Sequence, residues 1–178
     1  MFKKILVALD RSLIGQQVFE EALGLAKLTQ ASLMLLHVLS PEEEGSPYVP
    51  MLSNMDYYPG FSSQSFELYQ KQWDTFKNKG IQMLQSFCAQ ANTAGVTTGF
   101  TQNIGNPGRI ICDLAHSCGA DLIVMGRRGR SGLTELFLGS VSNYVLHHSP
   151  CSVHVVHLSV ASKTDEAVKE TTSTISFN

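Results

Sequence analysis

Short runs of apolar residues with little polar alternation recur along the chain and predict strands that are buried on both faces. Four such runs cover residues 3–9, 32–39, 121–125 and 152–158, and a less regular one covers residues 96–102. Runs of this length without alternation are typical of parallel strands that helices cover from both sides. We therefore expect five strands of one parallel sheet.

The segments between these runs carry apolar residues at helical spacing instead. Ser12 is a candidate N-cap for a helix after the first strand, and further helical patterns cover residues 64–92, 107–118 and 140–148. Pro107 suits the first position of a helix, because the N–H group that proline lacks would be unpaired there. The first helical pattern rests on an apolar series formed by Val18, Leu23, Leu25, Ala26 and Leu28.

Strands that alternate with helices predict an α/β fold. The expected architecture is an open five-stranded parallel sheet with helices on both faces, a Rossmann-like arrangement with right-handed crossovers. The length of 178 residues favours one domain, expected over residues 1–158. Residues 159–178 are rich in Ser and Thr and lack apolar periodicity, so they are predicted to form a disordered tail.

An unusually long connection separates the second strand from the long helix. Residues 40–63 contain four of the six prolines, three tyrosines and a run of three glutamates. This connection leaves the carboxyl end of its strand, which is the edge where open α/β sheets bind ligands. The insertion is either a solvated surface loop or a lid or partner-binding loop, and the sequence leaves both possibilities open.

Composition and charge narrow the classes of partner. The formal net charge is -2, which does not favour nucleic acid or another polyanion as a partner. No apolar run approaches the roughly 18 residues of a membrane span, and the apolar start is too short for a secretory signal. We therefore expect a cytoplasmic protein without a membrane partner. The four cysteines show no C-x-x-C spacing and are expected to be small buried side chains.

The most specific chemical signal lies in residues 125–142. Gly126 and Gly129 follow the fourth strand, and Gly139-Ser140 opens the last helical pattern. Glycine lets the backbone turn sharply and approach a ligand closely, and a helix N-terminus offers unpaired N–H groups to an anion. The stretch is therefore predicted to hold a phosphate. Positive charge nearby comes from Arg127, Arg128 and Arg130.

The spacing Gly-x2-Gly-x9-Gly-Ser separates this stretch from commoner glycine loops. A Walker A loop requires Gly-Lys-Ser/Thr after four intervening residues, and this stretch contains no lysine. The GxGxxG dinucleotide fingerprint is absent as well. The GxxG loop of RNA-binding KH modules joins two helices, whereas this stretch follows a strand.

The ligand of an open parallel sheet binds where neighbouring connections leave for opposite faces. We expect this switch point at the carboxyl ends of the first and fourth strands. Asp10 ends the first strand, so its carboxylate could accept a hydrogen bond from a ribose hydroxyl or a base amine. Asp10 could equally close a turn or cap the following helix, and both roles could hold together.

On these residues the chain resembles the universal stress protein family, and within it the subgroup that binds ATP. The first strand with its terminal Asp10 is similar to the family's first strand, and the glycine motif fits the family's nucleotide motif. The Gly-Asn-Pro at residues 105–107 and the Pro-Cys-Ser-Val at residues 150–153 resemble the approaches to its fourth and last strands. The resemblance covers residues 1–158 apart from 40–63 and implies an adenine-nucleotide alpha-hydrolase-like fold.

The resemblance implies an adenine nucleotide as the ligand, either ATP or else ADP or AMP. Any Mg²⁺ would be carried by the nucleotide phosphates, because no protein carboxylate is obviously placed for it. Arg11 departs from the Gly or Ser that the family often has after the first-strand Asp. The residues with an implied role in binding are Ala8, Leu9, Asp10, Val38, Met125, Gly126, Arg127, Gly129, Gly139, Ser140, Val141 and Ser142.

Catalysis is expected to be slow or absent. Phosphoryl transfer needs a group that orients the nucleophile, yet Asp10 would lie on the adenosine side and no histidine falls within the glycine motif. We therefore expect a stress-response or signalling module whose loops or partners respond to nucleotide occupancy. A weak ATPase or autokinase, and a dimerising scaffold without a nucleotide, are the alternative hypotheses.

The last strand, residues 152–158, is expected to lie at an edge of the sheet. An edge strand presents unpaired N–H and C=O groups that invite another chain. Universal stress proteins usually dimerise through this strand, so the resemblance implies a homodimer here. His154 and His157 could instead keep the edge apart from other chains.

Overall fold

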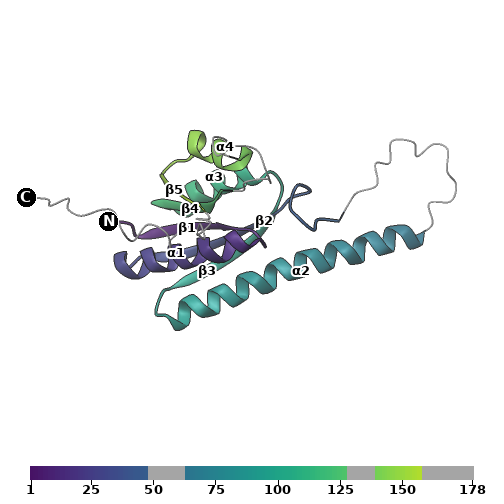
Figure 1. Cartoon of the computed structure of the whole chain (residues 1–178), viewed down its shortest axis with the longest axis horizontal. Coiled ribbons are helices and arrows are strands. Elements are labelled where there is room, and N and C mark those ends of the chain that lie inside the picture. Colours follow the sequence, from purple (N-terminus) through teal and green to yellow (C-terminus); the bar gives the residue numbers. More distant parts are fainter. Residues whose placement is uncertain (48–62, 128–138, 158–178) are drawn as a thin grey trace, which may run out of the picture.

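Five parallel strands form one sheet in the order β3-β2-β1-β4-β5. The computed structural model describes residues 1–47, 63–127 and 139–157 (Figure 1). The predicted disordered tail and part of the predicted insertion lie outside these residues. The strands are β1 (Lys4–Leu9), β2 (Ser32–Leu39), β3 (Thr98–Ile104), β4 (Leu122–Gly126) and β5 (Ser152–Val156).

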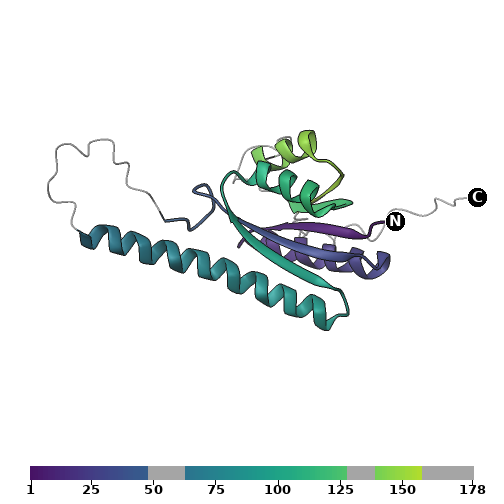
Figure 2. The same cartoon turned by 180° about the vertical axis from the view of Figure 1, so that it is seen from behind.

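Helices cover both faces of this sheet, which confirms the predicted fold class. Figures 1 and 2 show α1 and α2 on one face and α3 and α4 on the other. Within the described residues, no helix is long and apolar enough to cross a membrane. The helices are α1 (Leu13–Thr29), α2 (Ser63–Thr93), α3 (Pro107–Cys118) and α4 (Ser140–His148).

Because helices cover both faces of the sheet, the strand sequences are unbroken apolar runs. Side chains alternate between the faces of a strand. Along β1, Ile5, Val7 and Leu9 enter the core beneath α1 and α2, whereas Leu6 enters the core beneath α3 and α4. Because both sets are buried, β1 has no polar face.

The third strand begins two residues later than its apolar pattern predicts. Val96 is buried, but its N–H donates to the carbonyl of Ala91 at the end of α2. Gly95 has a φ of +82°, a value that favours glycine, and it turns the chain out of the helix. Val96 therefore packs as part of the helix ending, and pairing with β2 starts only afterwards.

The first helix differs from its prediction in two details. Ser12 occupies the N-cap position, but its hydroxyl donates to the Asp10 carboxylate and does not accept from a helix N–H. Leu28 is 79% exposed, although it belongs to the predicted apolar series. Val18 and Ala26 of that series are buried, and Ile14, Phe19 and Ala22 complete the buried stripe.

The second helix is the longest element, and only its later part lies along the sheet. Figures 1 and 2 show its beginning extending beyond the strands, where Phe66 and Leu68 are exposed. Gly80 lies where the helix meets the sheet. A methyl group at Gly80 would overlap the side chains of His37 and Gln102, so this contact requires glycine.

Substitution of Gly80 by alanine is expected to destabilise the fold. Alanine is the better helix former by about 1 kcal/mol, but forcing its methyl group against the buried His37 ring and the half-buried Gln102 amide costs about 1–3 kcal/mol. Gly24→Ala in α1 is the matched control, because a methyl group there meets nothing within 4 Å. Urea denaturation should show Gly80→Ala below the wild type and Gly24→Ala at or above it; equal or greater stability of Gly80→Ala would contradict the packing.

The four cysteines are free thiols, and only Cys112 is fully buried. Burial raises the pKa of the Cys112 thiol, and the nearby Asp113 raises it further. Burial also raises the pKa of the Cys151 thiol, against a hydrogen bond from Ser149 that lowers it. The expectation of small buried side chains therefore holds in full for Cys112 and in part for the others, which are half-buried.

Alkylation by iodoacetamide at neutral pH is expected to be slower at Cys112 and Cys151 than at a small free thiol. The thiolate is the reactive form, and a raised pKa leaves less of it at a given pH. Raising the pH should accelerate both reactions. Peptide mapping after timed alkylation measures each site, and unfolding in urea should remove the difference. Rates equal to those of N-acetylcysteine in the native protein would contradict this assignment.

Candidate functional site

A cavity of about 350 Å³ opens at the carboxyl ends of β1, β2 and β4. This is the predicted switch point, because the strand order reverses here. The chain adds β2 and β3 on one side of β1 and then adds β4 and β5 on its other side. The cavity brings together eleven of the twelve residues predicted to bind a nucleotide. The twelfth, Gly129, lies outside the described residues.

The end of β1 supplies Ala8, Leu9 and Asp10 to the cavity. The Asp10 carboxylate accepts hydrogen bonds from the Ser12 N–H, at 3.1 Å, and from the Ser12 hydroxyl. The predicted turn role of Asp10 is thus present, and the same side chain lines the cavity. Gly15 lets α1 begin directly beside this turn, because a side chain there would overlap the Asp10 carbonyl oxygen.

The end of β2 and the turn that follows form a second wall. Val38 was predicted here, and Ser40, Glu42 and Glu43 join it. The Ser40 hydroxyl accepts from the N–H of Glu42 at 3.1 Å, which closes the turn. The start of the predicted insertion is therefore part of the cavity wall, although residues 48–62 lie outside the described part of the chain.

Glu43 is buried in this wall and bonded to a histidine of β2. Its carboxylate lies 2.9 and 3.0 Å from Nε2 of His37, and its side chain is 4% exposed. Gln102 on β3 places its amide nitrogen 2.9 Å from Nδ1 of the same ring. Neither Glu43 nor His37 is among the residues predicted from the sequence to line the site. The available signal was a histidine inside an apolar strand, six residues before a glutamate.

The middle of the cavity is apolar. Ile14 and Val18 of α1 face it from one side of the sheet, and Ile111 of α3 faces it from the other. A methyl group on Gly126 would lie 3.2 Å from Ile14 and Val18, so glycine keeps this space open. Because such apolar residues occur throughout any core, the sequence carried no signal that these particular ones line a site.

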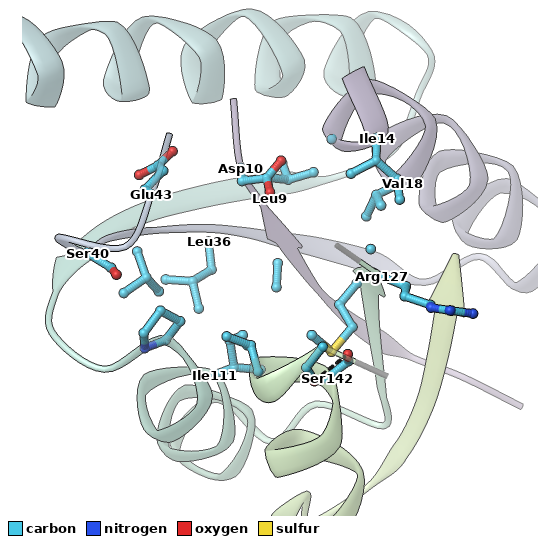
Figure 3. A pocket seen from close by; sticks show the side chains of 18 of the residues that line it. Leu9, Asp10, Ile14, Val18, Leu36, Ser40, Glu43, Ile111, Arg127 and Ser142 are labelled. Atoms are coloured by element: carbon cyan, nitrogen blue, oxygen red, sulfur yellow. Dashed lines mark hydrogen bonds between the residues drawn. The ribbon is translucent and has the colours of Figure 1, made fainter. Parts of the chain in front are cut away.

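The end of β4 and the start of α4 form the opposite side of the cavity. Gly139 occupies the N-cap position of α4 and has no side chain to accept from the first N–H groups. The first turn also contains no acidic residue. The Ser142 hydroxyl donates to the Gly139 carbonyl at 3.0 Å (Figure 3), so Ser142 would bind an anion through its backbone N–H. Arg127 adds positive charge at this side.

One side of the cavity therefore carries carboxylates, and the other side presents hydrogen-bond donors and positive charge. Figure 3 shows Ser40 and Glu43 on one side and Arg127 and Ser142 on the other, with Leu36 between them. The carboxylate side suits hydrogen-bond donors of a ligand, and the helix N-terminus suits an anion. Within the described residues, no group of three His, Cys, Asp or Glu side chains could hold a metal ion.

Comparison with known proteins assigns the fold to a family. The chain matches the family model described as "Universal stress protein family" over residues 1–157. A universal stress protein of Synechocystis sp. is 35% identical over 159 residues, which cover 87% of this chain and 97% of that protein.

Solved structures of the family share the architecture. A universal stress protein in complex with cAMP is 21% identical with a TM-score of 0.61, and the match covers 89% of this chain and 98% of that one. A universal stress protein family protein from Arabidopsis thaliana with AMP bound is 22% identical with a TM-score of 0.59, covering 89% and 93%. With a family match over nearly all of its length, the chain belongs to the universal stress protein family.

Proposed function

We propose that this chain is an adenine-nucleotide-binding module of stress response or signalling. ATP, or else ADP or AMP, occupies the cavity at the switch point and changes loop conformation or partner binding. One observation carries the proposal: the same cavity has acceptors in one part and donors in another. The carboxylates of Asp10, Glu42 and Glu43 line the first part, and an uncapped helix N-terminus and Arg127 line the second.

A nucleotide matches this arrangement part by part. Its ribose hydroxyls and base amine are donors for the carboxylates, its flat base fits the apolar middle, and its phosphates suit the N–H groups of α4. The volume of about 350 Å³ falls within the range of small-molecule sites. The cAMP and AMP held by two structural relatives belong to the same ligand class.

Cytoplasmic localisation, Mg²⁺ carried on the phosphates and a homodimer complete the proposal. β5 is the last strand of the sheet, so its outer edge would accept another strand. The His154 ring bonds to Glu21 of α1 at 2.9 Å, which turns this side chain toward α1 and away from the strand edge. This contact weakens the alternative in which His154 keeps other chains apart.

Substitution of Ser140 by aspartate is expected to weaken ATP binding by about tenfold or more, because like charges that face each other cost several kcal/mol. An acid in the first turn of a helix is itself stabilising by about 0.3–1 kcal/mol, so the variant should remain folded. Isothermal titration with ATP and with adenosine measures the effect. Adenosine carries no phosphate, so its affinity should not change.

Ser140→Asn is the matched control for this experiment, because it changes size and keeps the charge. It should retain most of the ATP affinity. If Ser140→Asp binds ATP as tightly as the wild type does, the phosphates do not lie at α4. If the wild type binds neither ATP nor AMP, the proposed function is wrong.

Hydrolysis of ATP by the purified protein is expected to be far slower than the ordinary enzyme rate of about 1 s⁻¹. The carboxyl groups that line the cavity belong to the ends of β1 and β2, whereas the proposed phosphate side is formed by the end of β4 and the start of α4. Release of labelled phosphate under single-turnover conditions measures the rate. Turnover near 1 s⁻¹ that is lost in Ser140→Asp would favour the weak-ATPase alternative.

A further inference from the structure

A chain of hydrogen bonds leads from the cavity wall to the middle of α2. Glu43 lines the cavity and contacts Nε2 of His37, and Nδ1 of His37 contacts the amide nitrogen of Gln102. The same nitrogen donates to the backbone carbonyl of Lys77 in α2 at 3.1 Å. We call Glu43, His37, Gln102 and the Lys77 carbonyl the relay.

The direction of every hydrogen bond in the relay is fixed by its chemistry. The Lys77 carbonyl can only accept, so the amide group of Gln102 must present its nitrogen there. This nitrogen is also a donor toward His37, so Nδ1 of the ring must accept. The ring proton is therefore on Nε2, where it is donated to the Glu43 carboxylate. His37 can hold both neighbours only as this neutral tautomer.

The relay is tightly packed as well as bonded. His37 is fully buried, and Gly80 brings the backbone of α2 against both His37 and Gln102. Glu43 is the only member that lines the cavity. A shift of the turn that carries Glu43 would thus leave buried polar groups of the relay without a partner, unless α2 shifted with it.

A second contact joins the residue that follows Asp10 to α2. The guanidinium of Arg11 lies 5.2 Å from the ring centre of Phe76, in the cation–π arrangement. The same guanidinium approaches the backbone at Gly45, in the turn after β2.

We propose that the relay couples occupancy of the cavity to the packing of α2 on the sheet, so that α2 senses the bound ligand. This inference rests on the proposed function and adds a route of regulation to it. A ligand that touches the wall at Glu43 restrains the turn, and the relay passes that restraint to α2. Coupling of this kind is reciprocal, so a loosened α2 weakens ligand binding.

Hydrogen exchange of α2 with and without nucleotide tests the coupling directly. Saturating ATP, with AMP in a parallel series, should slow exchange of amides 76–84 in the wild type by at least about fivefold, the lower end of common couplings. Gln102→Leu removes both of its donor contacts but alters no cavity-lining residue. In this variant the slowing should shrink to less than about twofold, with ATP affinity reduced about fivefold by reciprocity.

Asn103→Leu is the matched control on the same strand. Asn103 is exposed, and its side chain accepts a hydrogen bond from Thr101 outside the relay. This variant should keep both the slowing and the ATP affinity of the wild type. Full slowing with unchanged affinity in Gln102→Leu would overturn the proposal.

A second pair of variants keeps the test decisive if Gln102→Leu does not fold. Both variants are measured at saturating ATP, which offsets any loss of affinity at this cavity-lining residue. Glu43→Gln retains an oxygen that accepts from His37 and should keep the slowing of α2, whereas Glu43→Leu should lose it. Equal slowing in both would overturn the proposal. Glu44→Leu in the same turn, at an exposed position outside the cavity, controls for the lost charge and should match the wild type.

Two further readouts separate the possible failures. Titration of the wild type comes first: if neither ATP nor AMP binds, the proposed function and the coupling both fail. Binding without any slowing of α2 refutes the coupling alone. The relay itself is tested without ligand, because ¹⁵N NMR should show His37 protonated on Nε2 and unprotonated on Nδ1. The opposite tautomer would overturn the relay.

Discussion

The burial of β1 between two parallel neighbours is the constraint on which the rest of the structure depends. β1 pairs with β2 on one edge and β4 on the other, and helices cover both of its faces. A strand enclosed in this way can present polar chemistry only at its ends. Because the connections from the central strands diverge at the carboxyl end, the cavity opens there, and Asp10 becomes part of its wall.

The polarity of the cavity follows from which elements end around it. β1 and β2 end in segments that carry Asp10 and Glu43, whereas α4 begins with a glycine and presents backbone N–H groups. A carboxylate wall and a helix N-terminus attract opposite parts of a ligand. A simple anion would meet the carboxylates unfavourably, and a neutral nucleoside would leave the N–H groups of α4 without an acceptor. A nucleoside phosphate would satisfy both sides, and for this reason it is the class of ligand that we propose.

The sequence predicted the parts of the fold and the site that depend on local pattern. Apolar runs located the strands, and the glycine spacing located Gly126, Gly139 and the start of α4. Contacts between distant segments were not predictable in the same way. In the sequence, Glu43 is one of three consecutive glutamates in a polar loop. Only the folded structure, in which β2 pairs with β3, shows that Glu43 contacts His37 and that Gln102 contacts the same ring. Ser12 takes the predicted N-cap position but its hydroxyl bonds to Asp10, and Val96 precedes the strand that was expected to contain it. Both differences have a related cause, since each residue serves a neighbouring turn that propensity does not describe.

The relay and the contact between Arg11 and Phe76 differ in how they would transmit a change to α2. The contact between Arg11 and Phe76 involves a charge that salt can screen, and the attraction varies gradually with distance. Within the relay, His37 and Glu43 are buried, so salt screens their contact less than it screens a contact at the surface. The hydrogen bonds of the relay are also directional and weaken steeply when misaligned. A directional link of this kind is lost abruptly when its atoms shift out of line, so it is better suited than the contact between Arg11 and Phe76 to the coupling that we propose.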